Sequence, residues 1–179
     1  MERYFITDPS YYNSLDSFKD YLTTVYKSNH IDFACFRDKI NKNINPYIDI
    51  FLKISKEFGI KKTLLNSIID ERFYGVHLTS SQFNLIKKAK EKNLFVIVST
   101  HSLDEIEKVK ALGADAVTYS PIFSTPNKGS PKGVEELKKA VYISSPMKCF
   151  ALGGIVSDEH IKMIEKSNCY GFASIRYFV

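Results

Sequence analysis

The stretch Ala114–Gly133, ADAVTYSPIFSTPNKGSPKG, joins a short apolar run to a polar and irregular loop. Residues Ala116 to Tyr119 have the β-branched and aromatic side chains of a buried strand, and Pro121 ends it because proline has no N–H for a sheet hydrogen bond. The loop offers hydroxyls, an amide and the ammonium of Lys128 on a backbone loosened by two glycines. Such groups suit an anionic ligand such as a phosphate ester. A solvated surface loop is the alternative.

The same succession of a short apolar run and an amphipathic segment recurs along the whole chain. The amphipathic segments are about ten to fifteen residues long, and their apolar residues recur at the three- and four-residue spacing of one helix face. This alternation is typical of repeated strand and helix units around a parallel sheet. The predicted strands are Arg3–Thr7, Ile31–Phe36, Thr63–Leu65, Gly75–Leu78, Leu94–Val98, Asp115–Tyr119, Cys149–Leu152 and Tyr170–Ile175.

Eight strands with seven or so intervening helices predict an α/β fold, a (β/α)8 TIM barrel that forms a single domain over residues 1–179. A doubly wound open sheet is the alternative, but no GxGxxG motif follows the first predicted strand. The sequence ends just after the last predicted strand. We therefore expect the eighth helix to be missing or truncated, with an apolar flank of the barrel left uncovered.

Composition and charge exclude several classes of protein. The net charge is +5, but Lys and acidic residues alternate along the predicted helices, so no basic stripe points to nucleic acid. No apolar run is long enough for a membrane span, and the N-terminus lacks the layout of a signal peptide, so we expect a cytoplasmic protein with no membrane partner. Cys35, Cys149 and Cys169 are far apart and predict buried thiols, not a disulfide framework.

Cationic and polar residues follow the predicted strands, where the catalytic groups of a barrel lie. Arg37 and Lys39, two residues apart, point to the same side of an extended backbone and could clamp a pyrophosphate, unless both pair with Asp38 in an ordinary loop. Gly153 and Gly154 follow the seventh strand, where this fold usually binds phosphate through backbone N–H groups. The other candidates at strand ends are Asn66, Ser99, Thr100, His101, Ile175 and Arg176.

In order and spacing, these segments resemble the thiamine-phosphate synthase and TenI family over nearly the whole chain. The most specific marks are STHSLDE at Ser99–Glu105 and PIFSTPNK at Pro121–Lys128. YFITD at Tyr4–Asp8, FRDK at Phe36–Lys39, GVHL at Gly75–Leu78, GAD at Gly113–Asp115 and LGGI at Leu152–Ile155 add to the likeness.

The resemblance implies a barrel that joins hydroxymethylpyrimidine pyrophosphate to hydroxyethylthiazole phosphate. The departing pyrophosphate leaves a pyrimidine carbocation, which the thiazole nitrogen captures, so the protein mainly stabilises departing charge. By this likeness Arg37 and Lys128 are the catalytic residues. Arg37, Lys39, Asn66 and Lys128 hold the pyrophosphate, Ser99 lies near the pyrimidine, and Thr125, Asn127, Gly154 and the backbone at Ile175 hold the thiazole phosphate.

The departures from the family pattern concern the metal site and the proton shuttle. The synthases hold Mg²⁺ with two Asp residues, at positions that are Ser67 and Gln82 here, and neither replaces a carboxylate. Cys35 stands where the synthases have Gln, and Arg176 where they have Ser. The thiazole tautomerases of the family use a His at the position of Pro121, and proline cannot move a proton.

We therefore expect a divergent, TenI-like member that binds thiazole phosphate or thiamine phosphate with weak or altered activity. Its partners are small phosphorylated thiazole or pyrimidine ligands. No cofactor is tightly bound, and Mg²⁺ enters only through the substrate pyrophosphate. Two alternatives stay open: a non-enzymatic regulatory or interaction protein on the same barrel, with a homodimer through the uncovered flank, and a thiazole tautomerase with another proton shuttle.

Overall fold

The computed structural model describes residues 1–126 and 128–179, in which eight parallel strands close into a barrel. Each strand pairs with its sequence neighbours, and the last pairs with the first, Tyr4 facing Ala173. All eight predicted strands are present, with ends shifted by a residue or two. They are β1 (Glu2–Ile6), β2 (Phe33–Phe36), β3 (Lys62–Asn66), β4 (Gly75–Leu78), β5 (Phe95–Thr100), β6 (Ala116–Tyr119), β7 (Lys148–Leu152) and β8 (Gly171–Ser174).

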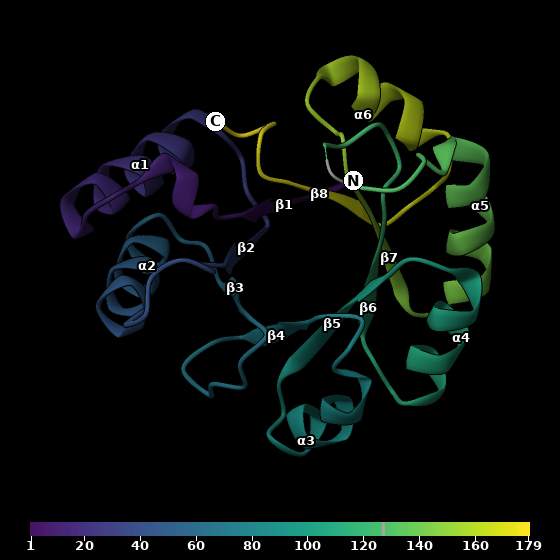
Figure 1. Ribbon diagram of the computed structural model, residues 1–179, viewed down its shortest axis with the longest axis horizontal. Helices are drawn as coiled ribbons and strands as arrows, with labels where there is room; N and C mark the ends of the chain where they lie inside the picture. Colours follow the sequence, from purple (N-terminus) through teal and green to yellow (C-terminus); the bar gives the residue numbers. More distant parts are fainter. Residues whose placement is uncertain (127) are drawn as a thin grey trace.

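Six α-helices in the described part of the chain surround the barrel (Figure 1). They are α1 (Leu15–Ser28), α2 (Asn45–Glu57), α3 (Ile86–Glu91), α4 (Leu103–Ala111), α5 (Gly133–Ser144) and α6 (Asp158–Glu165), with 3-10 turns at η1 (Pro9–Tyr11) and η2 (Phe83–Leu85). The expected number, seven or so, was too high, because residues 67–74 cross from β3 to β4 without a helix. Phe73 partly replaces that helix, since it is buried and stacks on Phe51 of α2.

Local signals explain where the helices begin. The side chain of Ser14 accepts from the N–H of Ser17 at the start of α1, and Ser102 accepts from Glu105 at the start of α4. Ser14 and Ser102 are therefore the N-caps of α1 and α4. Pro46 lies in the first turn of α2, where its missing N–H costs no hydrogen bond.

The flank between β8 and α1 is covered, although the described residues after β8, 175–179, form no helix. Phe178 is buried and stacks on Phe172 of β8, with ring centroids 5.7 Å apart and planes 4° from parallel. The Nδ2 of Asn29 donates to the carbonyl of Phe178, which ties the C-terminal segment to the end of α1. The absence of the eighth helix was predicted correctly, but the expectation of an uncovered flank is wrong at this place because two aromatic rings fill it.

The core has two shells, one inside the barrel and one between the strands and the helices. Alternate residues of each strand face opposite ways, so Tyr4 and Ile6 belong to the inner shell while Phe5 between them packs in the outer one. Inside the barrel, aromatic and aliphatic side chains fill the space near the amino ends of the strands. Polar side chains such as His77 and Ser99 replace them toward the carboxyl ends. All three cysteines are buried and free, as predicted.

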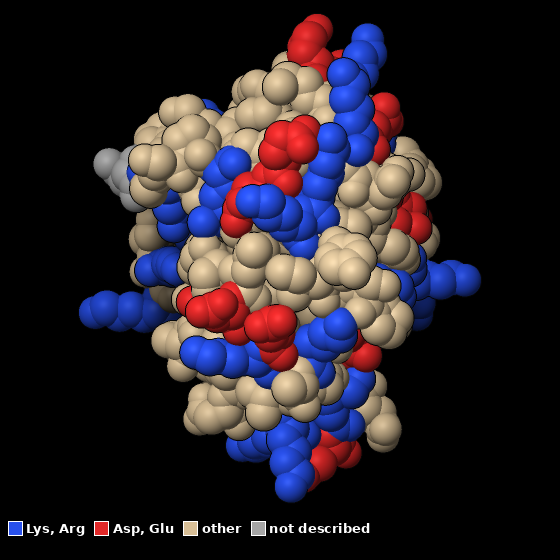
Figure 2. All heavy atoms as spheres, turned by 90° about the vertical axis from the view of Figure 1, so that its right-hand side faces the viewer, with Lys and Arg blue, Asp and Glu red and all other residues tan. Residues whose placement is uncertain are grey.

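Charges of both signs are interspersed on the face shown in Figure 2. Several form ion pairs along helices, such as Lys138 with Glu135 on α5 at 2.7 Å. In the described residues no helix is both long and apolar enough to cross a membrane.

Candidate functional site

A pocket of about 500 Å³ opens at the carboxyl ends of the strands. The loops after β1 to β8 build its walls, as expected for a barrel of this type. The structure brings eleven of the thirteen predicted residues together around it, and Asn127 lies outside the described residues. Thr100 does not line the pocket, because its side chain is buried and donates to the carbonyl of Thr118. The eleven are Arg37, Lys39, Asn66, Ser99, His101, Thr125, Lys128, Gly153, Gly154, Ile175 and Arg176.

The loop after β2 presents its two cations to the pocket. Arg37 is anchored by its backbone N–H, which donates to Thr7 Oγ1 at 2.8 Å, and its guanidinium pairs with Asp8 at 3.1 Å. Asp38 does not pair with either cation. Its carboxylate instead accepts from the Tyr12 hydroxyl and from Asn41, away from the pocket.

Asp38 shapes this loop as a hydrogen-bond acceptor. Burial alone disfavours its charge, but hydrogen bonds from Asn41, Ile40 and Tyr12 outweigh burial and lower the pKa of Asp38 below its ordinary value. The carboxylate therefore stays ionised and fixes the turn that follows Lys39. The ordinary salt-bridged loop considered in the sequence analysis does not form.

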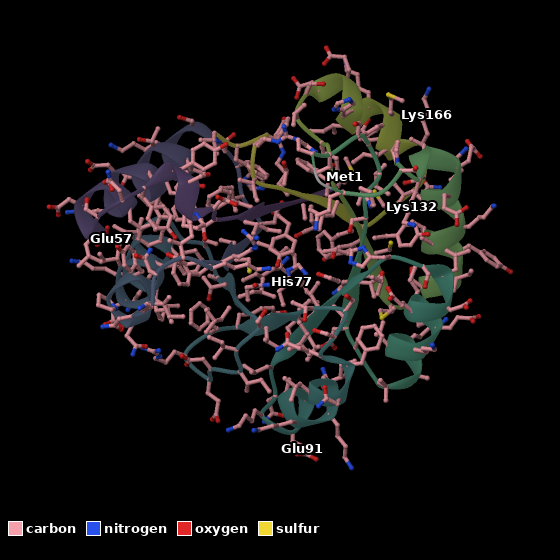
Figure 3. The ribbon with its side chains drawn as sticks, in the orientation of Figure 1. Met1, Glu57, His77, Glu91, Lys132 and Lys166 are labelled. Carbon is pink, nitrogen blue, oxygen red and sulfur yellow. The ribbon has the colours of Figure 1, made fainter. Side chains whose placement is uncertain are left out.

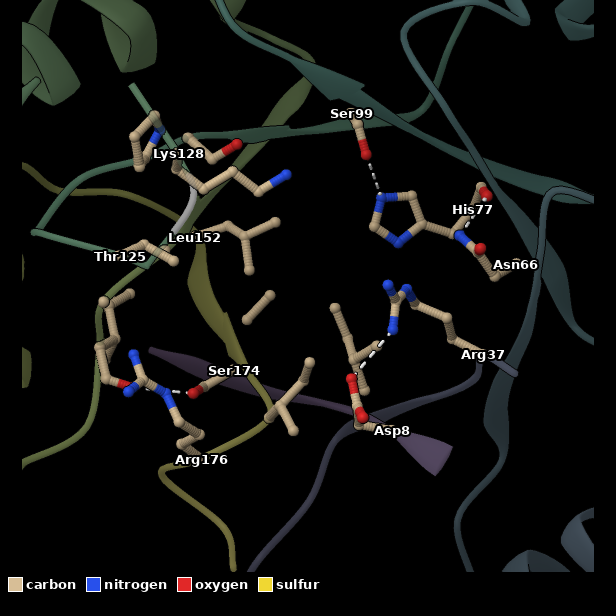
Figure 4. Close-up of a pocket in the computed structure, with 18 of the residues that line it drawn as sticks. Asp8, Arg37, Asn66, His77, Ser99, Thr125, Lys128, Leu152, Ser174 and Arg176 are labelled. Carbon is tan, nitrogen blue, oxygen red and sulfur yellow. Dashed lines mark hydrogen bonds and ion pairs between the residues drawn. The ribbon is translucent and has the colours of Figure 1, made fainter. Parts of the chain in front are cut away.

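Lys128 faces Arg37 across the pocket (Figure 4). It comes from the loop after β6, where its backbone N–H donates to the carbonyl of Thr125 at 3.2 Å. The charge of Arg37, then burial and the charge of Lys128, lower the pKa of Lys39. Three cations from two loops thus repel one another in the free protein, and an anion placed among them would relieve that repulsion.

The glycine pair after β7 supports the β6 loop. Both glycines have positive φ, +96° at Gly153 and +70° at Gly154, a conformation that side chains disfavour. A Cβ on Gly154 would lie 2.6 Å from the carbonyl oxygen of Ser124, and one on Gly153 would lie 2.8 Å from Pro121 Cα. Phe123 also donates its N–H to the carbonyl of Gly153. Glycine is required here because the two loops touch through their backbones.

Next to this pair, the loop after β8 completes the same wall. Ser174 donates from Oγ to the carbonyl of Ile155 at 2.8 Å and accepts from the N–H of Tyr177. These bonds fix the turn that carries Ile175 and Arg176. Figure 4 shows Arg176 on the opposite side of the pocket from Arg37, so the pocket has cations at two separate ends.

A buried histidine links the barrel interior to the pocket. His77 of β4 lies near the barrel axis (Figure 3), with Nδ1 at 2.7 Å from the Tyr4 hydroxyl and Nε2 at 3.0 Å from Ser99 Oγ. Burial, and secondarily the charge of Arg37, lower the pKa of His77 to about 4. The imidazole is therefore neutral near pH 7.

The neutral state of His77 lets us assign its proton. Burial raises the pKa of Tyr4 well above its ordinary value, so its hydroxyl keeps its proton and donates to Nδ1. Nε2 then carries the proton and donates to Ser99 Oγ. Because Ser99 Oγ accepts this hydrogen bond from His77, its own hydroxyl proton remains available to a ligand in the pocket.

The loops after β3 and β4 are joined by a glutamine. The Nε2 of Gln82 donates to the carbonyl of Ser67 at 3.0 Å, and its Oε1 accepts from the N–H and the hydroxyl of Thr79. We call this arrangement the Gln82 clasp. Beside it, Asn66 Oδ1 accepts from the Ser67 hydroxyl at 3.2 Å.

A second histidine lines the pocket at its mouth. His101 Nδ1 lies 3.2 Å from both the carbonyl oxygen and the Oγ of Ser120, and the backbone N–H of His101 donates to the Glu105 carboxylate. The next residue, Ser102, caps the first turn of α4. His101 therefore stands beside Pro121 with a fixed backbone.

Three contributors were not predicted as site residues: Asp8, His77 and Tyr4. Asp8 follows β1, so the rule that strand ends face the pocket would have found it. His77 alternates with outward-facing residues of β4, but its contacts with Tyr4 and Ser99 join three different strands. Sequence spacing carries no signal for such contacts.

A family model described as thiamine monophosphate synthase matches residues 4–178. The chain belongs to this family. A protein of Aquifex aeolicus named putative thiamine-phosphate synthase 2 is 32% identical over 98% of this chain and 96% of its own length. A thiamine-phosphate synthase of Fusobacterium nucleatum is 37% identical over 56% of this chain and 50% of its own length.

Comparison with solved structures supports the fold. The structure of a thiamine phosphate pyrophosphorylase from Pyrococcus furiosus matches 97% of this chain and 85% of its own length, with a TM-score of 0.79 and 23% identity. The TIM barrel predicted from the sequence, and the family resemblance stated there, are both confirmed.

The residues present do not fit the Mg²⁺ site that the family resemblance implies. Hard dications take oxygen ligands and usually one or two carboxylates. At the two positions concerned, Gln82 Oε1 already accepts two hydrogen bonds from Thr79, and Ser67 offers a hydroxyl in place of a carboxylate. Within residues 1–126 and 128–179, no group of three or more His, Cys, Asp or Glu side chains could hold a metal ion.

Proposed function

We propose that this family member binds hydroxyethylthiazole phosphate or thiamine phosphate, with weak or altered synthase activity. The observation that carries the proposal is the meeting of Arg37, Lys39 and Lys128 around one pocket whose adjoining loops lack the two carboxylates. The cations favour a phosphorylated ligand, and the missing carboxylates argue against the full synthase mechanism.

The two ends of the pocket suit the two phosphorylated groups of the synthase substrates, the thiazole phosphate and the pyrimidine diphosphate. Gly153 and Gly154 hold the β6 loop close, and Thr125, Ile175 and Arg176 lie around the same end, where barrels usually bind a phosphate. Arg37, Lys39 and Lys128 suit the more highly charged diphosphate at the other end. Ser99, as a hydroxyl donor between them, suits a ring nitrogen of a heterocycle.

In a residual synthase reaction, the bond from the pyrimidine methylene to the diphosphate oxygen breaks, and the thiazole nitrogen forms a new bond to that methylene carbon. Negative charge grows on the leaving oxygen. Arg37 and Lys128 are preorganised cations that stabilise this charge more than they stabilise the substrate. Neither residue transfers a proton in this step.

Titration calorimetry tests the proposal with three ligands: thiazole phosphate, thiamine phosphate and pyrophosphate. We expect saturable binding of at least one of the two thiazole-containing phosphates, and no binding of any ligand at about 1 mM removes the proposal. A synthase assay with both substrates then measures activity. Binding with no turnover favours the non-enzymatic regulatory alternative on the same barrel.

One observation favours a second candidate, a thiazole tautomerase that uses His101. Its imidazole lies in the pocket wall and touches Ser120, the neighbour of Pro121, which occupies the position of the family's shuttle histidine. Proton NMR of thiazole phosphate tautomers would detect the reaction. Loss of catalysis in His101→Ala supports this candidate, and an unchanged tautomer ratio with wild-type protein excludes it.

A further inference from the structure

The Gln82 clasp joins the β3 and β4 loops without charge. Ser67 sits in a left-handed conformation with φ of 66°, its N–H donates to the carbonyl of His77, and its own carbonyl accepts from Gln82. The glutamine oxygen is in turn held by two bonds from Thr79. Gln82 Oε1 therefore already accepts two hydrogen bonds, and neither position 67 nor position 82 offers a carboxylate to a metal ion.

The charge on the pocket wall is strongly positive at this end. Among the described residues that line the pocket, Asp8 carries the one carboxylate, and it is paired with Arg37 at 3.1 Å. Lys39 and Lys128 add two more positive charges. A diphosphate entering here meets cations on fixed loops, so the protein offers the neutralising charge that a divalent ion would otherwise bring.

We propose that this pocket binds a free diphosphate group without a divalent cation, and that the Gln82 clasp links the two loops in place of a metal. The inference rests on the proposed function, since the diphosphate enters the same pocket. The inference also predicts the direction of the effect of Mg²⁺ on affinity. Mg²⁺ should weaken diphosphate binding, because the ion neutralises the ligand charge that Arg37, Lys39 and Lys128 recognise.

The test is calorimetric titration of the whole chain with inorganic pyrophosphate, first in EDTA and then in excess MgCl₂. We expect binding in EDTA and affinity lower by about tenfold or more with Mg²⁺. Binding that appears only with Mg²⁺ overturns the inference. If thiazole phosphate binds but pyrophosphate binds in neither buffer, the inference fails and the proposed function survives, whereas no binding of either ligand removes both.

Two variants sharpen the result. The double variant Ser67→Asp/Gln82→Asp introduces two carboxylates, and Asp tolerates the left-handed backbone at position 67 better than most residues. We expect it to bind pyrophosphate weakly in EDTA and better with Mg²⁺, the reverse of wild type. Gln82→Glu, nearly isosteric, should lower affinity in EDTA by about tenfold. Unchanged affinity of Gln82→Glu, with a wild-type circular dichroism spectrum, contradicts the inference.

Discussion

His77 Nε2 lies 3.0 Å from Ser99 Oγ, so a buried side chain of β4 sets the hydrogen-bonding role of a pocket hydroxyl on β5. The other ring nitrogen of the imidazole is held by Tyr4 of β1. Strands β1, β4 and β5 thus fix one donor at the base of the pocket. The arrangement requires a neutral imidazole, because a protonated ring could not accept from the Tyr4 hydroxyl.

This requirement predicts an acid-sensitive contribution to stability. The pKa of His77 is about 4 in the folded protein against 6.5 ordinarily, so below pH 6.5 the unfolded chain binds the proton first. The stabilisation is complete above pH 6.5 and is lost as pH falls toward 4, by roughly 3 kcal/mol. Urea unfolding across this range measures it. His77→Gln should show a shallower loss than wild type, and parallel curves would contradict the assignment.

The second prediction concerns the charge on the leaving group. With the two carboxylates absent, fixed cations carry more of the stabilisation, so Lys128→Ala should lower a residual synthase rate by about 10²- to 10³-fold. Lys138→Ala is the control, since this lysine on α5 pairs with Glu135 at the surface and should leave the rate unchanged. Equal rates for wild type and Lys128→Ala would show that the β6 loop is not the site.

A third prediction separates loop packing from backbone strain. Gly154→Ala brings a Cβ against the backbone of Phe123 and Ser124, so we expect it to displace the β6 loop and weaken thiamine phosphate binding. Gly113→Ala is the matched control, because Gly113 also has positive φ but its Cβ would meet nothing within 4 Å. Both should lose about 1–2 kcal/mol of stability from strain. Equal ligand affinity in the two variants would refute a role of Gly154 in shaping the pocket.

The fourth prediction tests how the flank without an eighth helix is closed. Phe178 is buried against Phe172 and Phe5, so Phe178→Ala should cost about 3 kcal/mol in the free energy of unfolding. Val179→Ala, at a half-exposed position, should cost little. Chemical denaturation measures both, and a loss below about 0.5 kcal/mol for Phe178→Ala would mean that the aromatic contact does not stabilise the barrel.

The barrel and most of the pocket could be predicted because they follow from periodicity and topology. Alternating strands and helices fix the closed sheet, and a closed parallel sheet brings its strand ends together, so that Arg37, Lys39 and Gly153 line one pocket. Contacts between specific side chains could not be predicted. The bond from Gln82 to Ser67 depends on how two loops fold back on each other.

The missing helix after β3 and the covered flank after β8 have the same explanation. Residues 67–74 and 175–179 are too few for full helices, but whether other side chains fill the space depends on packing. Phe73 and Phe178 do so by stacking on rings from α2 and β8. Aromatic residues near a chain end or in a short connection have no periodicity that would reveal such a role.

Recognition of a phosphorylated ligand by fixed cations is tested by comparing thiamine phosphate with thiamine. The two ligands differ only in the phosphate, so titration calorimetry on the same protein isolates its contribution. We predict that thiamine phosphate binds at least 100-fold more tightly than thiamine, about the effect of two charge-assisted hydrogen bonds. Equal measurable affinity for the two ligands would contradict it.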